Sequence, residues 1–98
     1  MLRHIVLLQW LASATPNDQS AAVDELRALP GHIREIRAYR VEADAHLAPG
    51  NFDLAIVADF DDVDGYIAYR DHPAHAAVIA RRIKPILAAR AALQHQLD

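Results

Sequence analysis

The sequence predicts an α+β domain with elements in the order β-α-β-β-α, followed by a segment that would complete the ferredoxin-like βαββαβ arrangement if it forms a strand. Two segments rich in bulky apolar residues, 3–11 and 52–60, predict buried strands. A helix-start signature follows each of them, Thr15-Pro16 after the first and Asp61-Asp62 after the second. A chain of 98 residues has room for one hydrophobic core, so we expect a single domain over 1–98.

The first predicted strand, residues 3–11, is apolar on both faces. Alternation of side chains places on one face His4, Val6, Leu8 and Trp10, and on the other Ile5, Leu7 and Leu11. A strand with two apolar faces must be covered on both sides, so we expect one further layer besides the helices. His4 is the polar residue of its face.

The first helix is predicted over residues 16–29. The Thr15 side chain can accept a hydrogen bond from an exposed backbone N–H, and Pro16 suits the first helical position. Asp18 stands where the acidic partner of a capping box is found. Apolar residues recur at helical spacing at Ala22, Leu26 and Leu29, and Pro30-Gly31 ends the element.

Residues 35–42 predict a second strand, less buried than the first because arginines alternate with Ile36, Ala38, Tyr39 and Val41. Residues 43–51 contain a Pro-Gly turn and predict a loop.

The strand predicted over 52–60 is strongly buried. Its regularly spaced apolar face consists of Phe52, Leu54, Ile56, Ala58 and Phe60.

The second helix is predicted to begin at the cap Asp61-Asp62 and to break at His72-Pro73, because proline removes a backbone donor. A further helical stretch is expected from Ala74 to about Arg82.

The tail after Pro85 is rich in alanine and leucine, which favours helix. Its apolar and polar residues also alternate, as they would in an edge strand. The residues alone leave these two possibilities open.

The opening segment RHIVLL and the segment FDLAIVADFDDVDGYIAY, which leads into DHPAH, resemble the stress-responsive A/B barrel (Dabb) family. The motif Tyr-x-x-His-Pro-x-His, here residues 69–75, is the most specific part of the likeness, which extends over the whole chain. The resemblance implies a four-stranded antiparallel sheet that pairs with that of a second copy to close a dimeric α+β barrel. It also implies that the tail is a strand.

The resemblance further implies a cavity, either between the sheet and the helices or within the barrel. One branch of the family comprises polyketide cyclases, which close a ring by aldol chemistry without a metal. The residues matching those that serve this chemistry are Tyr69, His75 and His4. A second strand histidine of that branch falls at Leu54 of this chain, which removes one polar group from the expected pocket.

These positions give the predicted site. His75 would move a proton while Tyr69 donates a hydrogen bond to a substrate oxygen, and a desolvated His4 would act as a base. The residues expected to contact the ligand are Val6, Leu8, Leu54, Ile56 and His72. Each of these residues also has a possible structural role. His4 could be a hydrogen-bonded core residue, His72 or His75 could cap a helix, and Tyr69 could pack its ring while its hydroxyl contacts water.

The sequence favours neither a metal nor a cofactor. His72 and His75 could share a metal with Asp71 or Asp59, but Pro73 constrains their geometry and a third strong ligand is not evident. The absence of cysteine excludes thiolate sites and disulfides. The chain has no glycine-rich phosphate loop.

Composition sets the expected partners. The net charge of −3 disfavours a nucleic-acid binder, and the apolar runs are too short for a membrane span, so we expect a cytoplasmic protein. Alanine accounts for 20 residues, which leaves few large side chains for a core and favours a homodimer joined through the sheets.

Two classes of function remain open from the sequence. One is a cavity that binds a small organic ligand and performs cyclase-like or lyase-like acid–base chemistry. The other is a non-catalytic stress-response or structural dimer module in which the same residues only pack.

Overall fold

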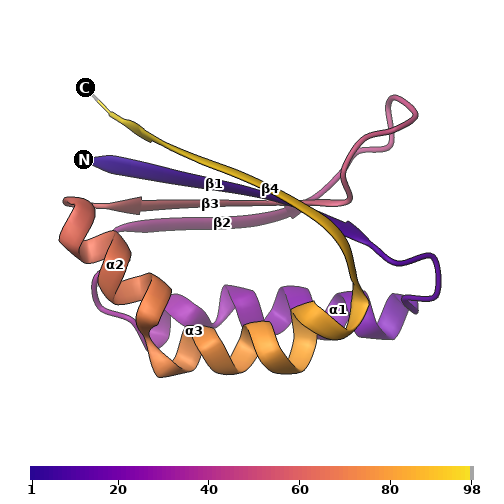
Figure 1. Ribbon diagram of the computed structural model, residues 1–98, viewed down its shortest axis with the longest axis horizontal. Helices are drawn as coiled ribbons and strands as arrows, with labels where there is room; N and C mark the ends of the chain where they lie inside the picture. Colours follow the sequence, from indigo (N-terminus) through magenta and orange to yellow (C-terminus); the bar gives the residue numbers. More distant parts are fainter. Residues whose placement is uncertain (98) are drawn as a thin grey trace.

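The computed structural model describes residues 1–97 and contains one four-stranded antiparallel sheet with helices on one of its faces (Figure 1). The strands are β1 (Leu2–Trp10), β2 (Ala38–Ala43), β3 (Leu54–Phe60) and β4 (Leu87–Gln96), and the α-helices are α1 (Pro16–Arg27), α2 (Val63–Asp71) and α3 (Pro73–Val78). Their order in the sheet is β2-β3-β1-β4. This is the predicted ferredoxin-like α+β fold.

Strand β1 lies between β3 and β4, and its register decides which side chains share a face. His4 pairs with Ala58 of β3 and with Gln94 of β4, while Leu8 pairs with Leu54 and Arg90. The face that carries His4 packs against the helices, and its apolar residues form the core. The predicted alternation along β1 is therefore confirmed, with His4 only 4% exposed.

The predicted capping box begins α1. Thr15 Oγ1 accepts a hydrogen bond from the backbone N–H of Asp18 at 3.1 Å, and an Asp18 carboxylate oxygen accepts one from the N–H of Thr15 at 3.1 Å. Ala22 and Leu26 are fully buried against the sheet. The α-helix ends at Arg27, and the 3₁₀ turn η1 (Leu29–Gly31) continues it, so the predicted range 16–29 spans two elements.

The second helical segment is interrupted where Pro73 predicts. Asp62 caps α2 by accepting from the N–H of Gly65 at 2.9 Å, and His72 separates α2 from α3. A π-helical turn η2 (Ile79–Ile83) and a 3₁₀ turn η3 (Lys84–Ile86) then lead into β4. The tail is thus a strand, as the family resemblance implies, because it pairs with β1 along its whole length.

Strand β2 departs most from the predicted boundaries, since it begins at Ala38 rather than residue 35. Residues 32–37 form turns, in which Ile33 is buried and Ile36 packs at the edge of the core. Strand β3 begins at Leu54 rather than residue 52, since Phe52 belongs to the loop. Asp53 joins the loop to β1: its N–H bonds to the Leu8 carbonyl and its carboxylate accepts a hydrogen bond from the N–H of Trp10, both at 2.8 Å. Apolar spacing alone did not distinguish these turns from strand.

The opposite face of the sheet, which we call the outer face, has no helix over it in residues 1–97 (Figure 1). It carries Ile5 and Leu7 of β1, Val57 of β3 and Leu93 of β4, and the last of these is 55% exposed. The bidentate ion pair between Arg3 and Asp59 lies on the same face, at 2.8 and 2.9 Å. Within the described part of the chain, no helix is both long and apolar enough to cross a membrane.

Candidate functional site

A cavity of about 210 Å³ lies between the helix-facing side of the sheet and the segment from α2 to η3. Its apolar walls are Val6, Leu8 and Leu26, Ile56, Ile79, Ile83 and Leu87. Its polar groups come from five separate elements and are His4, Tyr66, Tyr69, Arg70, His75, Lys84 and Arg90. Of the two locations that the family resemblance allows, the structure has a cavity between sheet and helices.

The imidazole of His4 is held at one side of this cavity. The side-chain amide nitrogen of Gln94 lies 2.8 Å from its Nδ1, so the amide donates and Nδ1 accepts. The His4 ring also packs against Tyr66, with ring centroids 4.9 Å apart. Burial, with a smaller contribution from the positive charge of Arg90, lowers the pKa of His4 to about 4. His4 is therefore neutral at pH 7.

The imidazole of His75 lines the same cavity, beside Tyr69. Their ring centroids are 4.4 Å apart, and His75 Nδ1 lies 3.1 Å from the backbone carbonyl oxygen of Arg70. A carbonyl only accepts, so Nδ1–H is the donor in this hydrogen bond. Burial lowers the pKa of His75, although the Arg70 carbonyl acts in the opposite direction. His75 thus both lines the cavity and bonds to the backbone near the Pro73 break.

These two hydrogen bonds give the neutral imidazoles opposite tautomers. His75 carries its proton on Nδ1, which leaves the lone pair of Nε2 free to accept a proton. His4 accepts at Nδ1 and so carries its proton on Nε2. Within residues 1–97 every buried side-chain nitrogen and oxygen has a hydrogen-bond partner. Nε2 of His4 has no partner there, so this atom is not fully buried, and the residue lines the cavity.

Two of the three tyrosine hydroxyls are hydrogen-bonded to each other, and the third has no hydrogen-bond partner in residues 1–97. The hydroxyls of Tyr69 and Tyr39 lie 3.0 Å apart and bond to each other. Burial raises the pKa of both phenols, which keeps them protonated. The hydroxyl of Tyr66 has no hydrogen-bond partner in residues 1–97, although its ring lies between His4 and Phe60. Tyr66 is thus the tyrosine whose hydroxyl is open to a ligand.

The structure brings together most of the predicted site residues but not all of them. His4, Val6, Leu8, Ile56, Tyr69 and His75 line one cavity. His72 does not line it, because its Nδ1 accepts from the backbone N–H of Ala74 at 3.0 Å and caps α3. Leu54 also lies outside the lining, since it is buried at the loop end of β3.

Five polar residues of the site were not predicted from the sequence: Tyr66, Arg70, Lys84 and Arg90, which line the cavity, and Gln94, which bonds to His4. Tyr66 lies one helical turn before Tyr69, so the shared helix face was a usable signal. Gln94 and Arg90 belong to β4, and their places depend on its pairing with β1. No local signal in the tail assigns that register.

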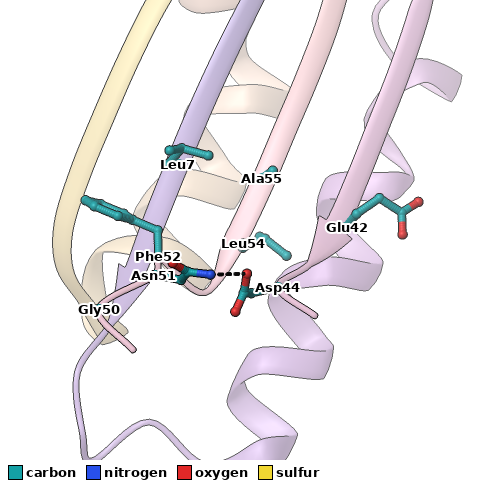
Figure 2. Close-up of a pocket in the computed structure, with 8 residues that line it drawn as sticks. All are labelled: Leu7, Glu42, Asp44, Gly50, Asn51, Phe52, Leu54 and Ala55. Carbon is teal, nitrogen blue, oxygen red and sulfur yellow. Dashed lines mark hydrogen bonds between the residues drawn. The ribbon is translucent and has the colours of Figure 1, made fainter. Parts of the chain in front are cut away.

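A second hollow lies at the loop end of the outer face (Figure 2). Its sides include Leu7 of β1 and Ala55 of β3, and Asn51 Nδ2 donates to an Asp44 carboxylate oxygen at 3.3 Å. This bond ties the loop to the end of β2. The hollow contains none of the histidines or tyrosines, so the helix-side cavity is the candidate site.

The described residues contain no group of three or more His, Cys, Asp or Glu side chains that could hold a metal ion. Asp59, considered above as a metal ligand, is paired with Arg3 on the outer face. Asp71 instead accepts two hydrogen bonds from Arg70.

Comparison with protein families gives a match over nearly the whole chain. The family model described as Stress responsive A/B Barrel Domain (Dabb) matches residues 2–95. An uncharacterized protein of Streptomyces coelicolor is 35% identical over 83 residues, which cover 82% of this chain and 84% of that protein.

Two solved structures place the fold among known ones. A protein of unknown function from Thermobifida fusca, described as dimeric and ferredoxin-like, is 45% identical with a TM-score of 0.90 and covers 98% of this chain and 90% of its own. A hydroxynitrile lyase from Passiflora edulis has a TM-score of 0.84 at 16% identity, over 99% of this chain and 93% of its own. At that identity the likeness concerns the fold alone.

Proposed function

The chain belongs to the stress responsive A/B barrel domain (Dabb) family, and from this premise we propose that it is a homodimer whose cavity binds a small organic ligand and performs acid–base chemistry on it. The observation that carries the proposal is the pair of neutral imidazoles with opposite tautomers on one cavity. A base and a hydrogen-bond donor in one small apolar site are the groups that an enolisation requires.

The proposed step removes a proton from the carbon next to a ligand carbonyl. Nε2 of His75 accepts this proton, and the C–H electron pair forms a carbon–carbon double bond. The carbonyl electrons move onto oxygen, where the developing negative charge accepts hydrogen bonds from Nε2–H of His4 and the hydroxyl of Tyr66. The enolate can then close a ring, as in a cyclase. In a lyase-like reaction the same base would instead remove the proton of a ligand hydroxyl group. The oxygen electrons then form a carbonyl, the adjacent carbon–carbon bond breaks with its electron pair on the leaving carbon, and protonated His75 returns the proton to that carbon.

The proposed dimer joins the outer faces of two sheets. Leu7 and Leu93 are 37% and 55% exposed on a face that no helix covers in residues 1–97. The Thermobifida fusca relative is described as dimeric. Pairing these faces would bury the second apolar side of β1 and add the burial that an alanine-rich chain of this length lacks.

The acid–base proposal is tested by deuterium exchange into an enolisable ketone. Acetophenone is incubated in D₂O with the wild-type protein, and incorporation at its methyl carbon is followed by NMR. We expect exchange above the buffer rate, lost in His75→Ala and kept in His46→Ala, since His46 lies on the exposed loop. Exchange that His75→Ala leaves unchanged would refute the proposed base.

The dimer is tested by sedimentation at micromolar concentration. Leu93→Glu places a charge on the outer face and should produce a monomer. Val63→Glu places the same charge on the exposed start of α2 and should leave the dimer intact. A folded wild-type monomer, or a Leu93→Glu dimer, would contradict joining through the sheets.

The alternative is a non-catalytic structural or stress-response dimer module. It is favoured by one observation, that Nδ1 of His4 and Nδ1 of His75 already bond within the protein, to Gln94 and Arg70. In that case the rings only pack, and neither exchange nor ligand binding depends on His75.

A further inference from the structure

The charges around the cavity differ from those of the chain as a whole. The chain has 13 acidic and 10 basic residues, yet no acidic residue lines the cavity, whereas Arg70, Lys84 and Arg90 do. Arg70 is paired with Asp71 at 2.9 and 3.1 Å. Lys84 and Arg90 form no ion pair within residues 1–97. The cavity therefore has an uncompensated positive charge at its side chains.

The sheet register places Arg90 on the same face of the sheet as His4, four residues further along the paired strands. Arg90 pairs with Leu8, and Gln94, four residues further along β4, pairs with His4. At about 3.3 Å per residue, the Cα atoms of Arg90 and Gln94 are roughly 13 Å apart. The long Arg90 side chain extends over part of this distance. Its positive charge contributes to lowering the pKa of both His4 and His75. A cavity of about 210 Å³ has room for a ligand of about one ring.

Much of the cavity wall is apolar. Val6, Leu8 and Ile56 form this part on the sheet side, and Ile79 and Ile83 of η2 form it on the helix side. A fully hydrated anion gains nothing from such walls, whereas a hydrocarbon body buries apolar area against them. A guanidinium binds a carboxylate with two parallel hydrogen bonds.

We propose that the cavity selects a small carboxylic acid with an apolar body, with its carboxylate at Arg90 and Lys84 and its other end at His4 and His75. The inference rests on the proposed function only in taking the cavity as a ligand site. It adds the chemical class of the ligand and assigns Arg90 as the residue that recognises it.

Benzoate and benzamide are suitable probes because they share one ring and differ in charge. Binding is measured by calorimetry at pH 7 to the wild type, to Arg90→Gln and to Arg34→Gln. Arg34 is the matched control, since its side chain is 95% exposed and lies outside the cavity. We expect benzoate to bind at least about tenfold more tightly than benzamide, and this preference to disappear in Arg90→Gln only. Arg90→Lys, which keeps the charge, should retain part of it.

Three results would overturn the inference. The first is equal binding of benzoate and benzamide, the second is full benzoate affinity in Arg90→Gln, and the third is displacement of benzoate by inorganic phosphate at equal concentration. If both probes bind equally and His75→Ala weakens both, the carboxylate selection fails while the ligand site stands. If neither probe binds, the inference fails, and the ketone exchange assay tests the proposed function separately. Arg90 is exposed, so Arg90→Gln should fold, and circular dichroism verifies this.

Discussion

Protonation of His4 should make the protein lose stability in mild acid. The folded-state pKa of His4 is about 4, against an ordinary value of 6.5, because the ring is buried with Arg90 nearby. The unfolded chain therefore binds this proton more readily than the folded chain. Stability from His4 is fully present above pH 6.5 and is lost as the pH falls from 6.5 toward 4.

The magnitude follows from this difference in pKa. At pH 5 an unfolded His4 is almost fully protonated and a folded one is almost fully neutral. One pKa unit corresponds to 1.36 kcal/mol, so the free energy of unfolding should fall by about 2 kcal/mol between pH 7 and pH 5 through His4 alone. The loss corresponds to roughly 10 °C in Tm for a domain of this size.

Urea unfolding at pH 7 and pH 5, followed by the fluorescence of the single tryptophan, measures this effect. His75 also has a lowered pKa, so the wild type should lose more than the His4 contribution. His4→Gln removes that contribution, and the difference between the two proteins isolates it. His46→Gln on the exposed loop should behave as wild type. Protein concentration is held constant because dimerisation contributes to apparent stability. Equal losses in wild type and His4→Gln would refute the reasoning.

Three further substitutions test other contacts. His72→Ala removes the cap of α3 and should lower the free energy of unfolding by about 0.5 to 2 kcal/mol in thermal melts, without changing benzoate binding; an unchanged Tm would contradict the capping role. Tyr39→Phe breaks the buried hydroxyl pair with Tyr69 and should cost about 1 kcal/mol in urea unfolding, and a neutral result would mean that this hydrogen bond contributes nothing. Leu26→Ala opens a hole in the core and should cost about 2 to 5 kcal/mol, whereas Leu47→Ala, 88% exposed, should cost less than about 0.5; similar costs would argue against the assigned core.

The helix ends and the strand faces were predictable because their signals are local. The hydrogen bonds between Thr15 and Asp18 join residues that are three apart in the sequence, so both partners of the cap can be recognised within one short segment. Alternation likewise placed His4 on the face of Val6 and Leu8 before any partner strand was known. The break at Pro73 follows from the missing backbone donor of proline itself.

Local sequence signals do not distinguish the roles of the two histidines of the motif. His72 and His75 are three residues apart, and both could cap the helix or line a pocket. The structure uses His72 as the cap of α3 and turns His75 toward Tyr69. The choice depends on how α2 and α3 pack on the sheet, which no short segment of sequence encodes.

By itself, the sequence determined the order of the first five elements, the start of α1, the break at Pro73 and the face that His4 shares with Val6 and Leu8, since each depends on residues within a few positions of one another. The tertiary structure decided that this face packs against the helices. The residues of the tail left helix and strand open, and the family resemblance implied a strand. The tertiary structure decided for the strand, because pairing with β1 outweighs the local preference of the alanines and leucines for helix. The same pairing brings Gln94 to His4 across 90 residues and Arg90 to the cavity. Contacts at that separation depend on strand register, which is set by the packing of the whole sheet against its helices.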